Sequence, residues 1–277
     1  MKKRTIITLG LMASLSLHAQ QSVRQQGFPK AVDAKGDMVE WQREIYREID
    51  LEKDANAGLF CPAETEQHQE GLFRKLFRLV ADSIIPAYQY QIDYNEVFSE
   101  RTKADFKAIL ENFHVPYSLK DSSIVVEDAD IPASEVRMYY VREAMYYDLS
   151  NSSFRKRIVA LCPVIIMEDE FTDEPVKYPL FWVRYKDLQP YLRRMTIIPD
   201  YANKATWMTM DEYFTLGKYR GEIYKVYNPH GRTLMQYAET DSAMAAQRQH
   251  IEEELLDVQE RTFSSPRRKI ATSGKQD

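Results

Sequence analysis

The sequence predicts an α+β fold, in which helices are segregated around a small antiparallel sheet and the chain ends in a long helix. Three observations carry this prediction. Apolar residues recur at helical spacings in the first third of the chain, β-branched and aromatic runs occupy residues 136–167, and a polar stretch with a narrow apolar stripe fills residues 241–263. With 277 residues, 44% of them hydrophobic, the chain can form one large domain or two small ones.

The first nineteen residues resemble a secretory signal peptide. Lys2, Lys3 and Arg4 precede a short apolar run, and a small residue, Ala19, follows it. We therefore expect an exported, soluble protein, and no lipid anchor on this chain, because no cysteine lies near Ala19. The predicted segments are a signal peptide (1–19), a polar arm (20–37), the globular domain (38–263) and a basic, disordered tail (264–277).

The charge balance restricts the kinds of partner. The whole chain carries a formal net charge of −5, which becomes −8 without the three N-terminal bases and −11 when the tail, at net +3, is also removed. Such a surface disfavours nucleic acids and anionic membranes, which proteins bind through basic patches. We expect no nucleic-acid binding and no direct membrane insertion, whereas a basic protein partner is compatible with this charge.

The first half of the domain is predicted to be mainly helical. Trp41, Ile45 and Ile49 recur at spacings of four, which predicts a helix over residues 38–51, and a second apolar stripe predicts a helix over residues 68–80. The other expected features of this half are a half-buried strand at 87–92, a helix that Ser99 caps and Pro116 ends, and a β-branched run at 123–127.

A long β-hairpin is predicted in the middle of the chain. Residues 136–149, which could also form a helix, are joined by a polar cluster at 150–153 to a β-branched run at 154–167. Pro163 in the second strand is expected to force an edge position or a bulge, because proline donates no hydrogen bond. The elements expected next are a strand at 176–184, a short helix at 187–192, a helix capped by Thr209 and a strand at 221–227.

The last predicted element is a long polar helix over residues 241–263. Its apolar stripe runs from Met244 through Ile251 and Leu255 to Val258, and its other face is acidic. A stripe this narrow can dock on the helix's own domain or on a neighbouring protein, and the sequence favours neither.

The sequence contains no recognisable catalytic or metal-binding motif. G-x-S-x-G, H-E-x-x-H and phosphate-binding glycine motifs do not occur, and no histidine has a second histidine or cysteine at helical metal-site spacing. The acidic residues of 168–174 lack the alternating ligands of a calcium loop and are expected to form an exposed turn. We expect no enzyme activity, no metal and no cofactor. The histidines of the mature chain are His68, His114, His230 and His250.

The two cysteines, Cys61 and Cys162, are about 100 residues apart in a chain expected to enter an oxidising compartment. A disulfide between them would close a large loop and stabilise the fold. Two buried free thiols are the alternative, and an even number of cysteines does not decide between these interpretations.

Several short segments together resemble a known family. The chain is similar to the gliding motility proteins called GldN or PorN over residues 38–263, essentially the whole mature domain. These segments are family signatures and not catalytic motifs. They are YREIDL at 46–51, LFCP at 59–62, PLFWVRY at 179–185, MDEYF at 210–214, GEIYK at 221–225 and DSAM at 241–244.

The resemblance implies a non-catalytic, structural subunit of the type IX protein secretion and gliding motility machinery of Bacteroidota. It implies a periplasmic location and association with the outer membrane through a lipoprotein partner, GldK or PorK. The implied assembly is a ring of many copies near the periplasmic domain of the motor protein GldM or PorM. A periplasmic module that binds a small ligand or a glycan is the alternative.

An assembly subunit needs large protein interfaces, in which exposed aromatic side chains are favoured. The tyrosine-rich stretches at 138–147 and 213–227 and the C-terminal helix could supply them, although core packing explains every second tyrosine equally well. The candidate interface residues are Tyr213, Tyr219, Tyr224, Ile251, Leu255 and Val258.

Overall fold

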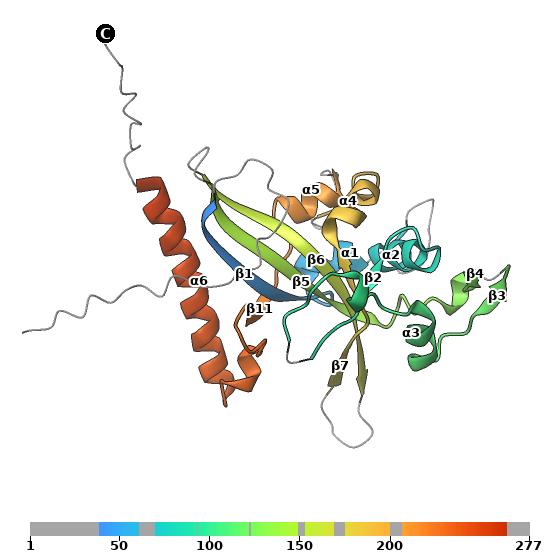
Figure 1. Cartoon of the computed structure of the whole chain (residues 1–277). Helices are drawn as coiled ribbons and strands as arrows, with labels where there is room; N and C mark the ends of the chain where they lie inside the picture. The colour runs from blue at the N-terminus through green and yellow to red at the C-terminus, as the bar shows by residue number, and fades with distance from the viewer. Residues whose placement is uncertain are drawn as a thin grey trace, which may run out of the picture. The chain divides into compact units, whose positions relative to one another are not determined.

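A seven-stranded antiparallel sheet is the framework of the protein (Figure 1). The computed structural model describes residues 39–60, 70–92, 94–121, 123–148, 153–168, 175–199 and 207–264. The strand order is β11-β1-β5-β6-β8-β2, and β7 pairs with the far end of β6. The strands are β1 (Val39–Asp50), β2 (Ala87–Tyr88), β5 (Val136–Asp148), β6 (Ser153–Glu168), β7 (Pro175–Pro179), β8 (Trp182–Arg184) and β11 (Glu222–Val226).

The helix predicted over residues 38–51 is wrong, because β1 occupies this segment between β5 and β11. Residues four apart share a face in a strand as well as in a helix, so the spacing of Trp41, Ile45 and Ile49 fits both structures. Arg43 and Arg47 occupy the positions at which apolar residues would have indicated a strand, because they lie on the same face of β1 as Ile45 and Ile49. Since both are charged, the sequence shows no alternation of apolar and polar residues, and the prediction missed this central strand.

The predicted hairpin is confirmed as β5 and β6, the two longest strands. Pro163 is not at an edge, because β6 pairs with β5 on one side and with β7 and β8 on the other. Pairing with β8 stops at Leu161 and pairing with β7 begins at Val164, so the proline lies beside the break between these strands. The missing N–H costs no strand pairing there, and the Pro163 carbonyl still accepts from the Leu180 amide at 3.0 Å.

The helices and short elements agree with the predictions in part. The helix capped by Thr209 is confirmed, with Thr209 and Glu212 forming a capping box. Ser99 begins only a short 3₁₀ turn, and Asp105 caps the helix that follows. The strand expected at 87–92 is two residues long, and the one expected at 176–184 is divided into β7 and β8. The helices are α1 (Ala57–Phe60), α2 (Leu72–Ala81), α3 (Phe106–Asn112), α4 (Tyr185–Leu192), α5 (Met210–Thr215) and α6 (Asp241–Ser264).

Short hairpins and 3₁₀ turns complete the described chain. Two separate two-stranded sheets form outside the main sheet, one of which contains the predicted β-branched run. Their strands are β3 (Ser118–Lys120), β4 (Ser123–Val125), β9 (Thr196–Ile197) and β10 (Met208–Thr209), and the 3₁₀ turns are Asp54–Asn56, Glu100–Thr102, Asp128–Asp130 and Leu234–Gln236.

The two faces of the sheet are covered differently. The helical face, which carries Ile45 and Ile49 of β1, packs in the main core and against α6. The covered face, which carries Glu44 and Tyr46, bears an aromatic cluster beneath a loop whose described residues, 89–92 and 94–99, are here called the covering loop. The α+β prediction is thus confirmed, with a sheet larger than expected. Every helix in the described residues is too short or too polar to cross a lipid bilayer.

Candidate functional site

The covering loop is held on the sheet by two buried cations. Arg142 of β5 donates to the backbone carbonyl of Glu96 at 2.8 Å, and Lys225 of β11 donates to that of Tyr94 at 2.6 Å. The relative exposures of Arg142 and Lys225 are only 6% and 3%. Because both bonds reach backbone atoms, they fix the path of the loop and leave its side chains free to project outward.

Neither cation is buried without compensation. The guanidinium of Arg142 also donates to the Glu44 carboxylate, with its Nε at 2.9 Å, and lies over the rings of Tyr46 and Phe98. The Lys225 ammonium lies 4.7 Å from the centre of the Tyr46 ring and 3.7 Å from the carboxylate of Glu96. Opposite charges, hydrogen bonds and aromatic faces together offset the cost of removing these cations from water.

A β-bulge explains why both Tyr224 and Lys225 point to the covered face. Lys225 pairs with Tyr46 and Ile223 pairs with Arg47, so Tyr224 is an extra residue in β11. A bulge of this kind opposes two residues to one and redirects a side chain that alternation would place on the other face. Tyr224 thus packs against Tyr46 and Tyr140 in the aromatic cluster.

Several buried polar atoms of this cluster have no hydrogen-bond partner among the described residues. They include the Tyr224 hydroxyl and the indole nitrogen of Trp182, whereas the Tyr46 hydroxyl faces the Glu96 carboxylate. Burial raises the pKa of Tyr46 well above its ordinary value, although Arg142 opposes this shift, and burial also raises the pKa of Tyr224. Both phenols are therefore neutral near pH 7 and are unsuited to act as bases. The aromatic cluster is therefore better suited to support the covering loop than to carry out a reaction.

The outer side of the covering loop is apolar. Ile92, Tyr94 and Val97 are 73%, 69% and 60% exposed, although they belong to a loop whose backbone is anchored. Exposed aliphatic and aromatic side chains on a fixed backbone are typical of a surface that binds another protein. The sequence prediction missed this surface. The signal that could have revealed it is the presence of Ile92, Tyr94 and Val97 among polar neighbours, together with the charged residues inside two strands.

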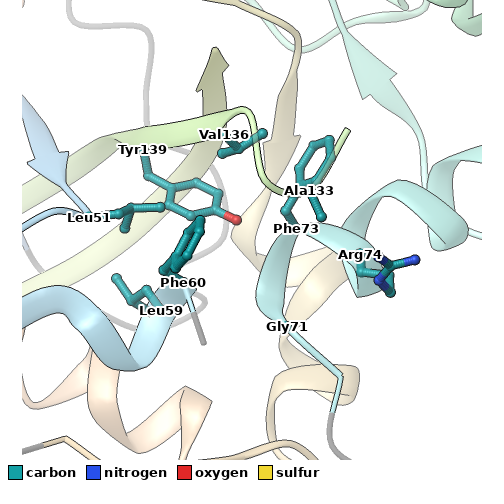
Figure 2. Close-up of a pocket in the computed structure, with 9 residues that line it drawn as sticks. All are labelled: Leu51, Leu59, Phe60, Gly71, Phe73, Arg74, Ala133, Val136 and Tyr139. Atoms are coloured by element: carbon teal, nitrogen blue, oxygen red, sulfur yellow. The ribbon is translucent and has the colours of Figure 1, made fainter. Parts of the chain in front are cut away.

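The described cavities are small. One of about 10 Å³, close to the size of a single water, lies among Leu59, Phe60, Phe73 and Tyr139, and Figure 2 shows the Tyr139 hydroxyl pointing into the space between the two phenylalanines. Another, of about 220 Å³, lies between β6, α4 and α5. Pockets for drug-sized ligands usually measure about 300–1,000 Å³.

Comparison with known proteins identifies the family. The family model described as gliding motility associated protein GldN matches residues 35–264. The chain belongs to the GldN family. This membership makes it a structural component of gliding motility, in agreement with the segments that carry the resemblance. A comparison with curated proteins finds no matching sequence.

All six candidate interface residues belong to this GldN-family domain, and five of them are buried in its cores. Tyr213 and Tyr219 belong to the main core, Tyr224 to the aromatic cluster, and Ile251 and Leu255 to a third cluster between α6 and the sheet. Burial raises the pKa of Tyr213 to about 12. The remaining residue, Val258, is half-buried. While α6 stays docked, the five buried side chains are not available to another protein.

Ion pairs add to the apolar contact of α6 with the sheet. Arg47 of β1 donates to Glu252 at 3.1 Å and also to the buried carboxylate of Glu143, likewise at 3.1 Å. Arg43 pairs with Glu254, and Arg248 of the helix donates to the carbonyl of Ile223 at 2.9 Å. Of the two alternatives for this helix, packing on its own domain is therefore the one that the structure shows.

The histidines and acidic residues considered in the sequence analysis do not form a metal site in the described part of the chain. Three or more potential metal ligands do not come together in those residues. His114 and His230 lie in turns, and His250 faces Glu254 at 3.4 Å within α6. His68 and the acidic residues 169–174 lie outside the described residues, as do the predicted signal peptide, arm and basic tail.

Among the described residues Cys162 is a buried free thiol, and its sulfur donates to the carbonyl of Pro163 at 3.5 Å. Burial raises its pKa well above the ordinary value, so the thiol is protonated near pH 7. Cys61 lies outside the described residues, and the disulfide between these two cysteines stays a prediction.

Proposed function

We propose that this chain is a non-catalytic, periplasmic subunit of the type IX secretion and gliding motility machinery. In this proposal it binds an outer-membrane lipoprotein of the GldK or PorK kind through the covering loop. Copies of the chain associate with one another into a ring, close to the periplasmic domain of a GldM- or PorM-like motor protein. The lipoprotein supplies the attachment to the outer membrane.

The observation that carries the proposal is the anchored covering loop in a domain of the GldN family. The molecule places two buried cations, Arg142 and Lys225, beneath this loop and binds both to its backbone carbonyls. These contacts hold the backbone of the covering loop in place and so stabilise its outer surface. Ile92, Tyr94 and Val97 give this surface the apolar character that a lasting protein contact requires.

The alternative of a small-ligand or glycan-binding module has less support from the geometry. Such modules bind their ligands in pockets lined by apolar and polar groups that converge on the ligand. Neither of the two cavities given above reaches the usual size of such a pocket. A deep pocket detected by binding of a glycan or small molecule to the purified chain would favour this alternative.

The test of the proposal is a substitution on the loop. Replacing Tyr94 with aspartate should weaken capture of the lipoprotein by at least about tenfold, because truncated central aromatic anchors cost well over 1 kcal/mol in many interfaces. Folding should be unaffected, since the Tyr94 side chain is exposed. Capture is measured by pull-down from solubilised outer membranes, and folding by the melting temperature.

Leu119 provides a matched control, because it is 61% exposed on the separate β3–β4 hairpin. Leu119→Asp should capture the lipoprotein as the wild type does. Equal capture by Tyr94→Asp and the wild type, with both folded, would remove the covering loop from the contact.

A further inference from the structure

The first part of β6 has an open edge. On one side β6 pairs with β5 along most of its length, but on the other side β8 pairs only with Ala160 and Leu161, and β7 only with residues 164–168. Within the described chain, no other strand and no hydrogen bond from outside the sheet reaches the backbone of residues 154–158. Such an edge presents a row of unpaired N–H and C=O groups, which an extended segment of another protein can satisfy by adding as a strand.

The edge is open because the chain leaves the sheet after β8. Arg184 is the last residue of β8 and pairs with Ala160, and Tyr185 begins α4. If β8 continued, its next residue would lie beside Val159 and the following ones farther along the same edge. Instead, α4 and α5 contact β6 from this side (Figure 1) and do not pair with it. The position of the next strand is therefore not taken by any described strand.

A concavity lies at this position, between β6, α4 and α5, with a volume of about 220 Å³. Ile158, Tyr185 and Phe214 of the main core provide its apolar walls. Thr215 is exposed at its margin. The volume is enough for one large side chain, so a strand added beside β6 could direct a single apolar side chain into this concavity.

The opposite face of the same edge carries an arginine without a charged partner. Arg157 pairs with Ala144, which pairs with Glu44 of the covered face, so the Arg157 side chain points away from the concavity. It is half-buried and forms no ion pair with any described residue. Side chains of an added strand alternate between the two faces, so the neighbours of an apolar residue in the concavity lie on the face of Arg157. A carboxylate is the complementary group there.

We propose that the open edge of β6 binds an extended segment of a partner protein in which apolar and acidic residues alternate. The segment pairs with residues 153–158, one of its apolar side chains enters the concavity, and a neighbouring carboxylate faces Arg157. This site is separate from the covering loop, which rests on Arg142 and Lys225. The inference therefore goes beyond the proposed function and does not depend on it.

The test uses the full mature chain and a labelled peptide of sequence TEVEFEVT with both ends blocked, and it measures binding by fluorescence anisotropy. We expect saturable binding with a Kd below about 1 mM. Two further peptides are methylated on the backbone nitrogens of either the apolar or the glutamate residues, which removes the donors from one edge of the strand. Only one edge faces β6, so one of these peptides should bind at least about tenfold more weakly than the other.

Substitutions in the chain assign the binding to this edge. Thr215→Trp fills the concavity from its margin and should weaken binding by at least about tenfold. Arg157→Glu should weaken it by about fivefold, and a peptide with lysine in place of each glutamate should then bind this variant better than the wild type. Lys120→Glu makes the same charge change at an exposed lysine of β3 and should leave binding unchanged.

Amide hydrogen exchange locates the bound peptide, which should slow exchange within residues 154–158. No saturable binding to the wild type, protection confined to another part of the sheet, or equal binding by the folded Thr215→Trp and Arg157→Glu variants would overturn the proposal. The covering loop is tested separately, because Tyr94→Asp should bind the peptide normally and Thr215→Trp should capture the lipoprotein normally. Failure of peptide binding with capture still dependent on Tyr94 would overturn this inference alone.

Discussion

Replacing Arg142 with alanine is expected to lower the free energy of unfolding by about 3–5 kcal/mol, because the change leaves a buried charge without its partner. Glu44 is 4% exposed and its carboxylate accepts from two nitrogens of Arg142. The same change removes the hydrogen bond to the Glu96 carbonyl, so the covering loop should also become mobile. Urea unfolding measures the free energy, and amide hydrogen exchange of residues 94–98 measures the loop.

Two comparisons separate the buried pair from ordinary surface charges. Arg137→Ala breaks an exposed pair with Glu52 at 3.8 Å and should cost less than about 1 kcal/mol. The double change of Arg142→Met and Glu44→Gln removes both charges and should recover much of the lost stability. If Arg142→Ala and Arg137→Ala lower the free energy of unfolding by the same amount, then Arg142 does not hold the covering loop on the sheet as described.

Replacing Leu255 with aspartate should detach α6 from the sheet. Leu255 is 5% exposed among Ile45, Ile223 and Ile251, and a carboxylate cannot be accommodated there without a partner. Loss of a buried leucine alone costs about 2–5 kcal/mol, and the introduced charge adds to this. We expect a lower melting temperature and rapid proteolysis within α6.

The adjacent residue, Leu256, is a matched control because it faces away from the sheet on the same helix and is 57% exposed. Leu256→Asp should change stability by no more than about 0.5 kcal/mol. An unchanged melting temperature for Leu255→Asp, combined with lost lipoprotein capture, would contradict intramolecular docking and make α6 an interface element.

The sequence predicts best those elements that carry a clear local signal. The hairpin of β5 and β6 is marked by the β-branched run of its second strand and by the polar turn before it, although the first strand alone could also form a helix, and α5 is marked by the Thr209 capping box. The segment of β1 has two interpretations, because a four-residue spacing satisfies both a helix and a strand. Its true partners, β5 and β11, are about 100 and 180 residues away, and pairing at such separation leaves no local signal.

The candidate site was harder to predict than the fold. Arg142 and Lys225 are hydrophilic residues within strands, and only the packing of the covering loop shows that they are buried. Tyr224 would face the other side of the sheet without the bulge that the pairing with β1 imposes. The tyrosines chosen from the sequence proved to be core residues, whereas the exposed apolar surface belongs to Ile92, Tyr94 and Val97 on the loop.

The most direct test of the central claim is the native mass and composition of the complex that the tagged, full-length chain forms in its own cells. The complex is purified from gently solubilised outer membranes, and its components are identified by mass spectrometry. The proposed function predicts a large assembly that contains many copies of this chain together with an outer-membrane lipoprotein. A monomeric chain recovered from the soluble periplasm without any lipoprotein would contradict it.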